Sequence, residues 1–140
     1  MRGFALKMMG AALVVAVVSC ENLRKDAPPV DFVTEVKPVL ERRCLECHNR
    51  DYVFAGLRLE TRELAMKGGR SGPVIIPGNP DDSLLHRVLL LGHENPVAMP
   101  PTPEGTFEEE KKVIRTWIAQ GATWPDNTKL VPPQYWPQNR

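Results

Sequence analysis

Two cysteines and a histidine stand close together in the run Cys44-Leu45-Glu46-Cys47-His48. A C-x-x-C-H run is the attachment signature of a c-type haem. Two cysteines about one helical turn apart can bond to the two vinyl groups of a porphyrin as thioethers, and the adjacent histidine can then ligate the iron. The sequence therefore predicts one covalent haem c, held by Cys44 and Cys47, with His48 as the proximal iron ligand.

Three other kinds of site could use the same residues. A thioredoxin-like redox pair needs a β-α-β context, which the sequence lacks. A zinc site needs four ligands; the two cysteines and one of His86 or His93 could supply three, but a histidine directly after the second cysteine is an awkward spacing. A disulfide between Cys44 and Cys47 suits an oxidising compartment but leaves His48 without a role.

Met99 is the candidate for the second axial position on the iron. It lies in the polar, proline-rich loop 96–105 rather than on an apolar helix face. The following Pro100 favours an extended conformation at Met99, and a thioether is a soft ligand that haem iron accepts. We therefore expect Met99 to be the distal ligand, with His93 and His86 as the other candidates. Met66 fits a packed helix side chain instead.

The first 20 residues have the features of an exported, lipid-modified protein. Two basic residues precede an apolar run at residues 8–18, which ends at Ser19-Cys20. This is the pattern of a secretory signal peptide, and the run is shorter than the roughly 20 residues that span a bilayer. Its end resembles the lipobox of bacterial lipoproteins. We therefore expect a signal peptide at 1–19, a lipidated Cys20 that anchors the protein to a membrane, and a periplasmic location.

The composition argues against some functions and predicts a small core. The 140 residues carry 18 Lys+Arg against 17 Asp+Glu, without a basic cluster, so nucleic-acid binding is not expected. Aromatic residues make up only 6% of a chain with 14 prolines and 10 glycines. A large apolar cofactor would fill part of such a core and couple folding to its attachment.

Helical patterns near both ends frame a long stretch of loops. We expect an all-α domain of three to four helices at residues 31–125, between a tether at 20–30 and a Pro-rich C-terminal tail at 126–140. The first expected helix starts at the cap Asp31, and Pro38 should either kink it or make it restart near Lys37. A short helix is expected at 61–67, and another is expected to be capped by Asn79, to have Pro80 at its first position and to lead into 83–91. The last is capped by Thr106 and Glu109 and ends at Gly121, and the residues on its apolar face are Phe107, Val113, Ile114, Trp117 and Ile118.

The whole pattern resembles class I cytochromes c and, in more detail, the planctomycete-type cytochrome c domain. The stretches that carry this resemblance are Pro38–Leu40, Cys44–His48, Gly56–Arg62, Lys67–Gly69, Ser71–Pro73, Pro77–Pro80, Ser83–Leu85, Met99–Pro101 and Trp117–Ala122. The resemblance implies thioether bonds at Cys44 and Cys47, a proximal His48 and a distal Met99. It also implies that the first and last helices cross on one side of the haem.

These features predict a membrane-tethered electron carrier rather than an enzyme, with a redox protein as its unidentified partner. One alternative is a haem enzyme or gas-sensing module in which Met99 swings away. Another is a haem subunit that docks a larger redox enzyme through the tail, with Tyr135 and Trp136. Haem propionates could pair with an arginine of the middle segment, which contains Arg58, Arg62 and Arg70.

Overall fold

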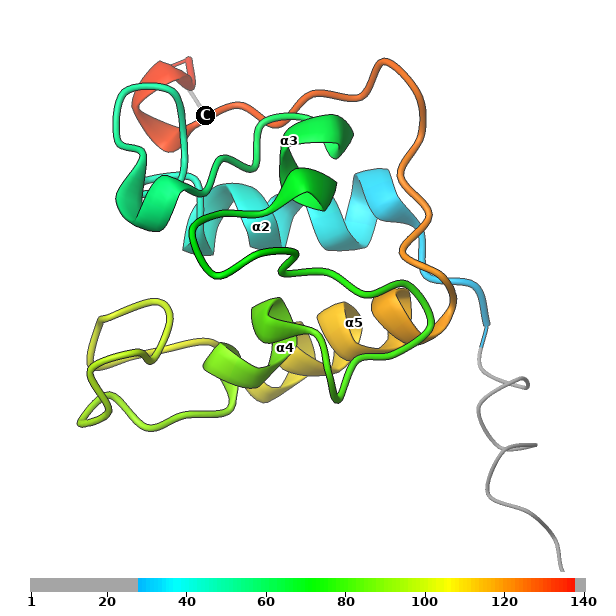
Figure 1. Ribbon diagram of the computed structural model, residues 1–140. Coiled ribbons are helices and arrows are strands. Elements are labelled where there is room, and N and C mark those ends of the chain that lie inside the picture. The colour runs from blue at the N-terminus through cyan, green and yellow to red at the C-terminus, as the bar shows by residue number, and fades with distance from the viewer. Residues whose placement is uncertain (1–27, 138–140) are drawn as a thin grey trace, which may run out of the picture.

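The computed structural model describes residues 28–137, and the described part of the chain is helical without strands, as expected (Figure 1). The predicted signal peptide and Cys20 lie outside the described residues. The elements are a π-helical turn η1 (Phe32–Val36), helix α2 (Lys37–Arg43), a 3₁₀ turn η2 (Phe54–Gly56), helices α3 (Arg62–Lys67), α4 (Leu84–Leu89) and α5 (Glu108–Ala119), and a 3₁₀ turn η3 (Pro133–Tyr135). The predicted all-α class is confirmed.

The first helix changes from a π-helical turn to an α-helix at Lys37, which agrees with the second of the two outcomes expected from Pro38. Asp31 caps η1, because its carboxylate accepts a hydrogen bond of 2.7 Å from the backbone N–H of Thr34. The N–H of Lys37 then bonds to the carbonyl of Phe32, one residue further back than in an α-helix. Pro38 has no N–H to donate, so it fits in the first turn of α2, where helices leave donors unpaired in any case.

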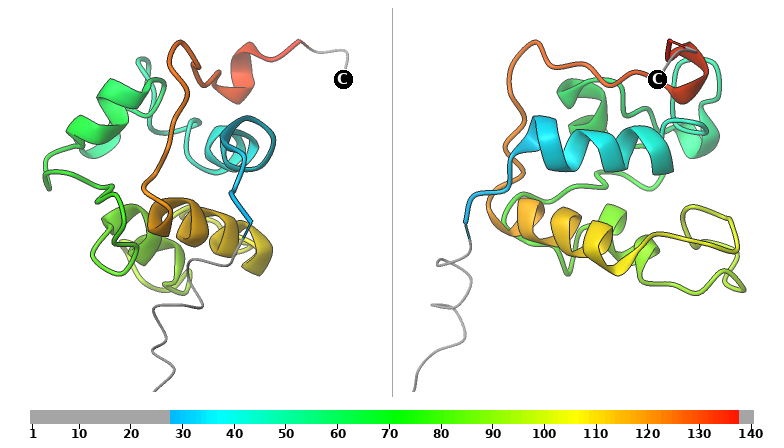
Figure 2. Two further views of the ribbon diagram at one scale, coloured as in Figure 1. Left: turned by 90° about the vertical axis from the view of Figure 1, so that its right-hand side faces the viewer. Right: turned by 180° about the vertical axis from the view of Figure 1, so that it is seen from behind.

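The two ends of the domain share one aromatic core. Phe32 of η1 packs against Trp117 of α5 and against Trp124, with ring centroids 5.7 and 4.3 Å apart. Trp117 is 1% exposed, and its indole N–H donates to the carbonyl of Thr123 at 2.8 Å. η1 therefore lies against the C-terminal half of α5, and the chain runs in opposite directions through the two (Figures 1 and 2).

The last helix begins later than the sequence suggested. Its cap is Phe107, whose N–H donates to the Glu110 carboxylate at 3.1 Å, so the predicted pair of Thr106 and Glu109 is wrong. Arg43, at the end of α2, donates to the same carboxylate at 2.9 Å and so draws Glu110 rather than Glu109 toward the domain. Phe107 lies outside the buried face and is 59% exposed.

Helix α4 is also shorter than predicted, because the residues before it form a separate turn. The Asn79 side chain accepts from the N–H of Asp82, and the Asn79 carbonyl accepts from the N–H of Ser83. The buried Ser83 hydroxyl donates to the Asn79 carbonyl and accepts from the N–H of Ile76. These bonds hold Ser83 in an extended conformation, so the helix starts at Leu84 and ends at Leu89.

The C-terminal segment, predicted as an extended tail, packs back onto the domain. The N–H of Leu130 donates to the carbonyl of Glu60 at 2.9 Å, and Leu130 is buried. Further on, the Tyr135 hydroxyl donates to the Asp51 carboxylate, and Arg50 stacks on the Tyr135 ring. The end of the described chain thus lies beside the loop that follows His48 (Figure 1).

Glu41 joins this segment to helix α2, which leads into the two cysteines. Its buried carboxylate pairs with Lys37 and accepts from the N–H of Val131 at 2.8 Å. Since a hydrogen bond to a charged group contributes about 1.5–3 kcal/mol, we expect Glu41→Ala to lower the free energy of unfolding of the holoprotein by that amount. Chemical denaturation would measure it, and the exposed Glu94→Ala should change it by less than about 0.5 kcal/mol. Equal effects of the two variants would show that the Val131 contact does not stabilise the fold.

Candidate functional site

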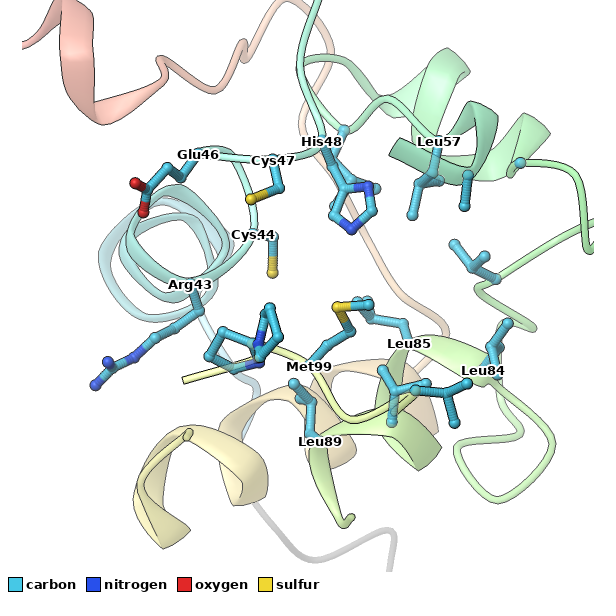
Figure 3. A pocket seen from close by; sticks show the side chains of 18 of the residues that line it. Arg43, Cys44, Glu46, Cys47, His48, Leu57, Leu84, Leu85, Leu89 and Met99 are labelled. Atoms are coloured by element: carbon cyan, nitrogen blue, oxygen red, sulfur yellow. The ribbon is translucent and has the colours of Figure 1, made fainter. Parts of the chain in front are cut away.

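The C-x-x-C-H run continues the last turn of α2. The N–H groups of Cys44 and Leu45 both donate to the carbonyl of Leu40, at 3.0 and 3.1 Å. The N–H groups of Cys47 and His48 then donate to the carbonyl of Cys44, at 3.2 and 3.0 Å. This tight turn places both cysteine sulfurs and the His48 ring at the wall of one cavity (Figure 3).

The cavity has a volume of about 800 Å³, within the range of roughly 300–1,000 Å³ for sites that bury a small molecule. Apolar side chains from the middle of the chain form much of its lining. They are Ala55, Leu57, Leu59, Val74, Leu84, Leu85, Val88, Leu89, Pro96, Val97, Pro100 and Pro101. This lining suits a large, mostly apolar group that is held at a few fixed points.

Met99 lies across the cavity from His48. Figure 3 shows the Met99 sulfur and one ring nitrogen of His48 pointing toward one another from opposite walls. The Met99 loop is tied to α4, because the N–H of Met99 donates to the carbonyl of Val88 at 3.1 Å. The neighbouring Ala98 is buried and donates its N–H to the carbonyl of Asn95 at 3.0 Å. The loop is therefore fixed where it presents the sulfur.

The other candidate ligands lie elsewhere. His86 is buried but outside the cavity lining, and its Nδ1 lies 3.1 Å from the carbonyl of Pro80. The His93 side chain is 66% exposed and faces Glu94. Met66 packs against the core, as its helical position predicted. Of the predicted iron ligands, the structure brings His48 and Met99 together.

His48 has the properties of a metal-ligating imidazole. Burial lowers the pKa of its ring, which favours the neutral form that can donate a lone pair. Within residues 28–137 its buried Nδ1 has no hydrogen-bond partner. Two thiols, a neutral imidazole and a thioether around an apolar cavity form a donor set that fits a covalent haem.

The two thiols are poor candidates for redox exchange or zinc binding. Burial, reinforced by the nearby Glu110 carboxylate, raises the pKa of the Cys44 thiol to about 12. Burial and the neighbouring Glu46 also raise the pKa of Cys47. Thiol–disulfide exchange uses the thiolate, which is scarce at neutral pH when the thiol pKa is high. For zinc, residues 28–137 contain no cluster of three or more Cys, His, Asp or Glu side chains placed to hold a metal ion. No disulfide joins Cys44 to Cys47 in the structure, unlike in the third alternative considered above.

Arginines lie at the edge of the cavity, but not all are those that the sequence suggested. Of Arg58, Arg62 and Arg70, only Arg70 is in the lining, and Arg58 pairs with Glu60 at 2.8 Å. Arg42 and Arg43 also line the cavity and were missed. Their position in the sequence could have identified them, because Arg42 and Arg43 directly precede Cys44. Residues at the end of the helix that leads into the cysteines must border the group that the cysteines bind.

Glu110 connects this edge to the start of α5. Partial burial alone would raise the pKa of its carboxyl, but hydrogen bonds from Arg43 and from the Phe107 N–H lower it overall. Because this pKa is lower in the folded state, the Glu110 carboxylate stabilises the protein at pH values above its ordinary pKa of 4.5. This stabilisation is lost as the pH falls through the lowered pKa.

The free energy of unfolding of the holoprotein should fall as the pH is lowered below about 5, and we expect this fall to be smaller in Glu110→Gln. Denaturation curves recorded at several pH values would measure it. Glu109→Gln, a neighbouring exposed acid, serves as the control. Identical pH profiles of Glu110→Gln and the unchanged protein would contradict this role.

A comparison with known families assigns the segment that contains these residues. Residues 44–103 match the family described as Planctomycete cytochrome C. The chain contains a planctomycete-type cytochrome c domain. The matched segment starts at Cys44 and includes Met99, and a cytochrome c domain implies covalent haem c. Searches of curated proteins and of solved structures returned no match. None of the cytochrome's helices within residues 28–137 is long and apolar enough to cross a membrane.

Proposed function

We propose that this c-type cytochrome carries electrons outside the cytoplasm with one haem c, attached through Cys44 and Cys47 and ligated by His48 and Met99. The family supports a c-type cytochrome electron carrier. The observation that carries the finer proposal is the placement of His48 and Met99 on opposite walls of one apolar cavity (Figure 3).

When bound, haem c supplies a one-electron iron couple. The residues of this chain set the conditions for it. His48 and Met99 offer a ligand from each side, which leaves no place for a substrate, and methionine ligation favours a comparatively high potential. Much of the lining is apolar, and the hydrogen bond from the Met99 N–H to the Val88 carbonyl holds the backbone that carries the sulfur. A fixed ligand set of this kind suits electron transfer better than gas binding.

The proposed location depends on the N-terminal sequence. The basic start, the apolar run at 8–18 and the lipobox-like end at Cys20 support export and lipidation. Covalent haem attachment at a C-x-x-C-H run fits the same compartment. We therefore propose that the protein is attached to the periplasmic side of a bacterial membrane.

Carbon monoxide separates the electron carrier from the gas-binding alternative. We expect the reduced holoprotein to keep its absorption spectrum under carbon monoxide, because Met99 occupies the second axial position. Partial unfolding in denaturant should then allow carbon monoxide to bind, which provides a positive control in the same sample. Rapid spectral change in the folded, reduced protein would favour a ligand-binding module.

A further inference from the structure

We propose that the cavity opens at the end of the domain opposite its membrane tether, so that the anchored cytochrome exchanges electrons with a water-soluble redox protein rather than with a quinol in the bilayer. This inference rests on the proposed lipid anchor at Cys20. It adds the direction in which the cavity faces and the chemical class of the partner.

The tether leaves the domain at a fixed place. The Gln120 side chain accepts from the N–H of Val30 at 2.9 Å and donates to the carbonyl of Pro28 at 3.0 Å. Gln120 directly follows the last residue of α5. The first described residues are therefore attached to the C-terminal end of that helix.

The cavity opens at the other end of the same helices. Its exposed lining residues come from the end of α2, from the loops around 55 and 70, and from the loop 96–104 that leads into α5. Figure 1 shows these segments together at one end of the domain and the start of the described chain at the other, and the view from behind in Figure 2 agrees.

Helix length sets the separation between the two ends. α5 has 12 residues, and an α-helix rises 1.5 Å per residue, so the helix is about 18 Å long. It begins at the mouth of the cavity and ends at Gln120. An electron from a quinol in the bilayer would have to cross the length of this helix, or the domain would have to turn over on its tether.

The mouth has the character of a transient protein interface. Its exposed apolar residues include Ala55 and Val97, and charged residues of both signs surround them, namely Arg42, Glu46, Arg70 and Glu104. Small interfaces between redox proteins combine an apolar centre with a polar rim in this way. The balanced charges and the exposed polar side chains suit a water-soluble protein surface better than the hydrocarbon of a bilayer.

The two ends of the chain allow a matched test, because the described C-terminal residues lie at the cavity end, where Tyr135 contacts Asp51. Two haem-loaded forms without residues 1–20 would be bound to phosphatidylcholine vesicles that contain nickel-chelating lipid. One form carries a histidine tag before Glu21. The other carries it after a copy of residues 21–27 added to Arg140, so that both tethers contain the same seven residues.

The readouts are quenching of a headgroup-labelled fluorescent lipid by the haem, and the rate of haem reduction by decylubiquinol in the vesicles. We expect the N-terminally anchored form to quench at least about twofold less and to be reduced more slowly. Equal or stronger quenching, or an equal rate, would overturn the proposed orientation. Haem content and ligation are measured on the same samples, so their loss would instead contradict the proposed function.

Discussion

Replacing both attachment cysteines, Cys44→Ala with Cys47→Ala, is expected to leave the chain without covalent haem and without a native fold. The cavity of about 800 Å³ would then lose the group that covers its apolar walls. Burial of each large apolar side chain contributes roughly 1.5–3 kcal/mol. The free energy lost when several of them are exposed to water is therefore as large as the whole net stability of a small domain, about 5–15 kcal/mol.

Far-ultraviolet circular dichroism and thermal unfolding of the purified variant would measure this loss. The third cysteine supplies the control, because Cys20→Ala should abolish lipidation but keep haem and fold. Native helical content and a cooperative unfolding transition in the haem-free double variant would show that the polypeptide core alone is sufficient.

Met99→Ala is expected to remove the weak near-infrared band that a methionine sulfur gives with low-spin ferric haem. The loss should be complete, because the other candidate ligands lie outside the cavity lining or at the surface. The reduction potential should fall, since a methionine axial ligand raises it. The reduced variant should also bind carbon monoxide rapidly, because one axial position is open.

His93→Ala is the matched control for the methionine. His93 lies close to Met99 in the sequence, but its side chain is exposed and faces Glu94, so the variant should keep the band and the potential. A band that survives in Met99→Ala and disappears in His93→Ala would transfer the ligand role to the histidine.

The sequence predicted the chemistry of the site better than its surroundings. Cys44, Cys47 and His48 are local in the chain, and a single helical turn is enough to place their side chains together. Met99 was identified from its type and its loop, although its approach to His48 depends on a long-range fold. Pro38 predicted an interruption of the first helix, as a kink or a restart, because the lack of an N–H has the same consequence in any context.

The errors concern contacts between segments that are distant in the sequence. Local capping rules could not choose between Glu109 and Glu110, because Arg43 of another helix decides which acid turns inward. The packing of the C-terminal segment depends on contacts such as Val131 with Glu41, which no local pattern encodes. The size of the cavity was equally inaccessible, since it results from side chains spread over the whole domain.

The central claim is that a single haem is covalently bound at Cys44 and Cys47. Intact mass spectrometry of the purified protein after extraction with acidified butanone tests it most directly, because this treatment removes non-covalent haem. We predict a polypeptide mass increased by one haem, with the lipid mass in addition where the anchor is present. A mass equal to the polypeptide, with the haem recovered in the organic phase, would contradict the claim.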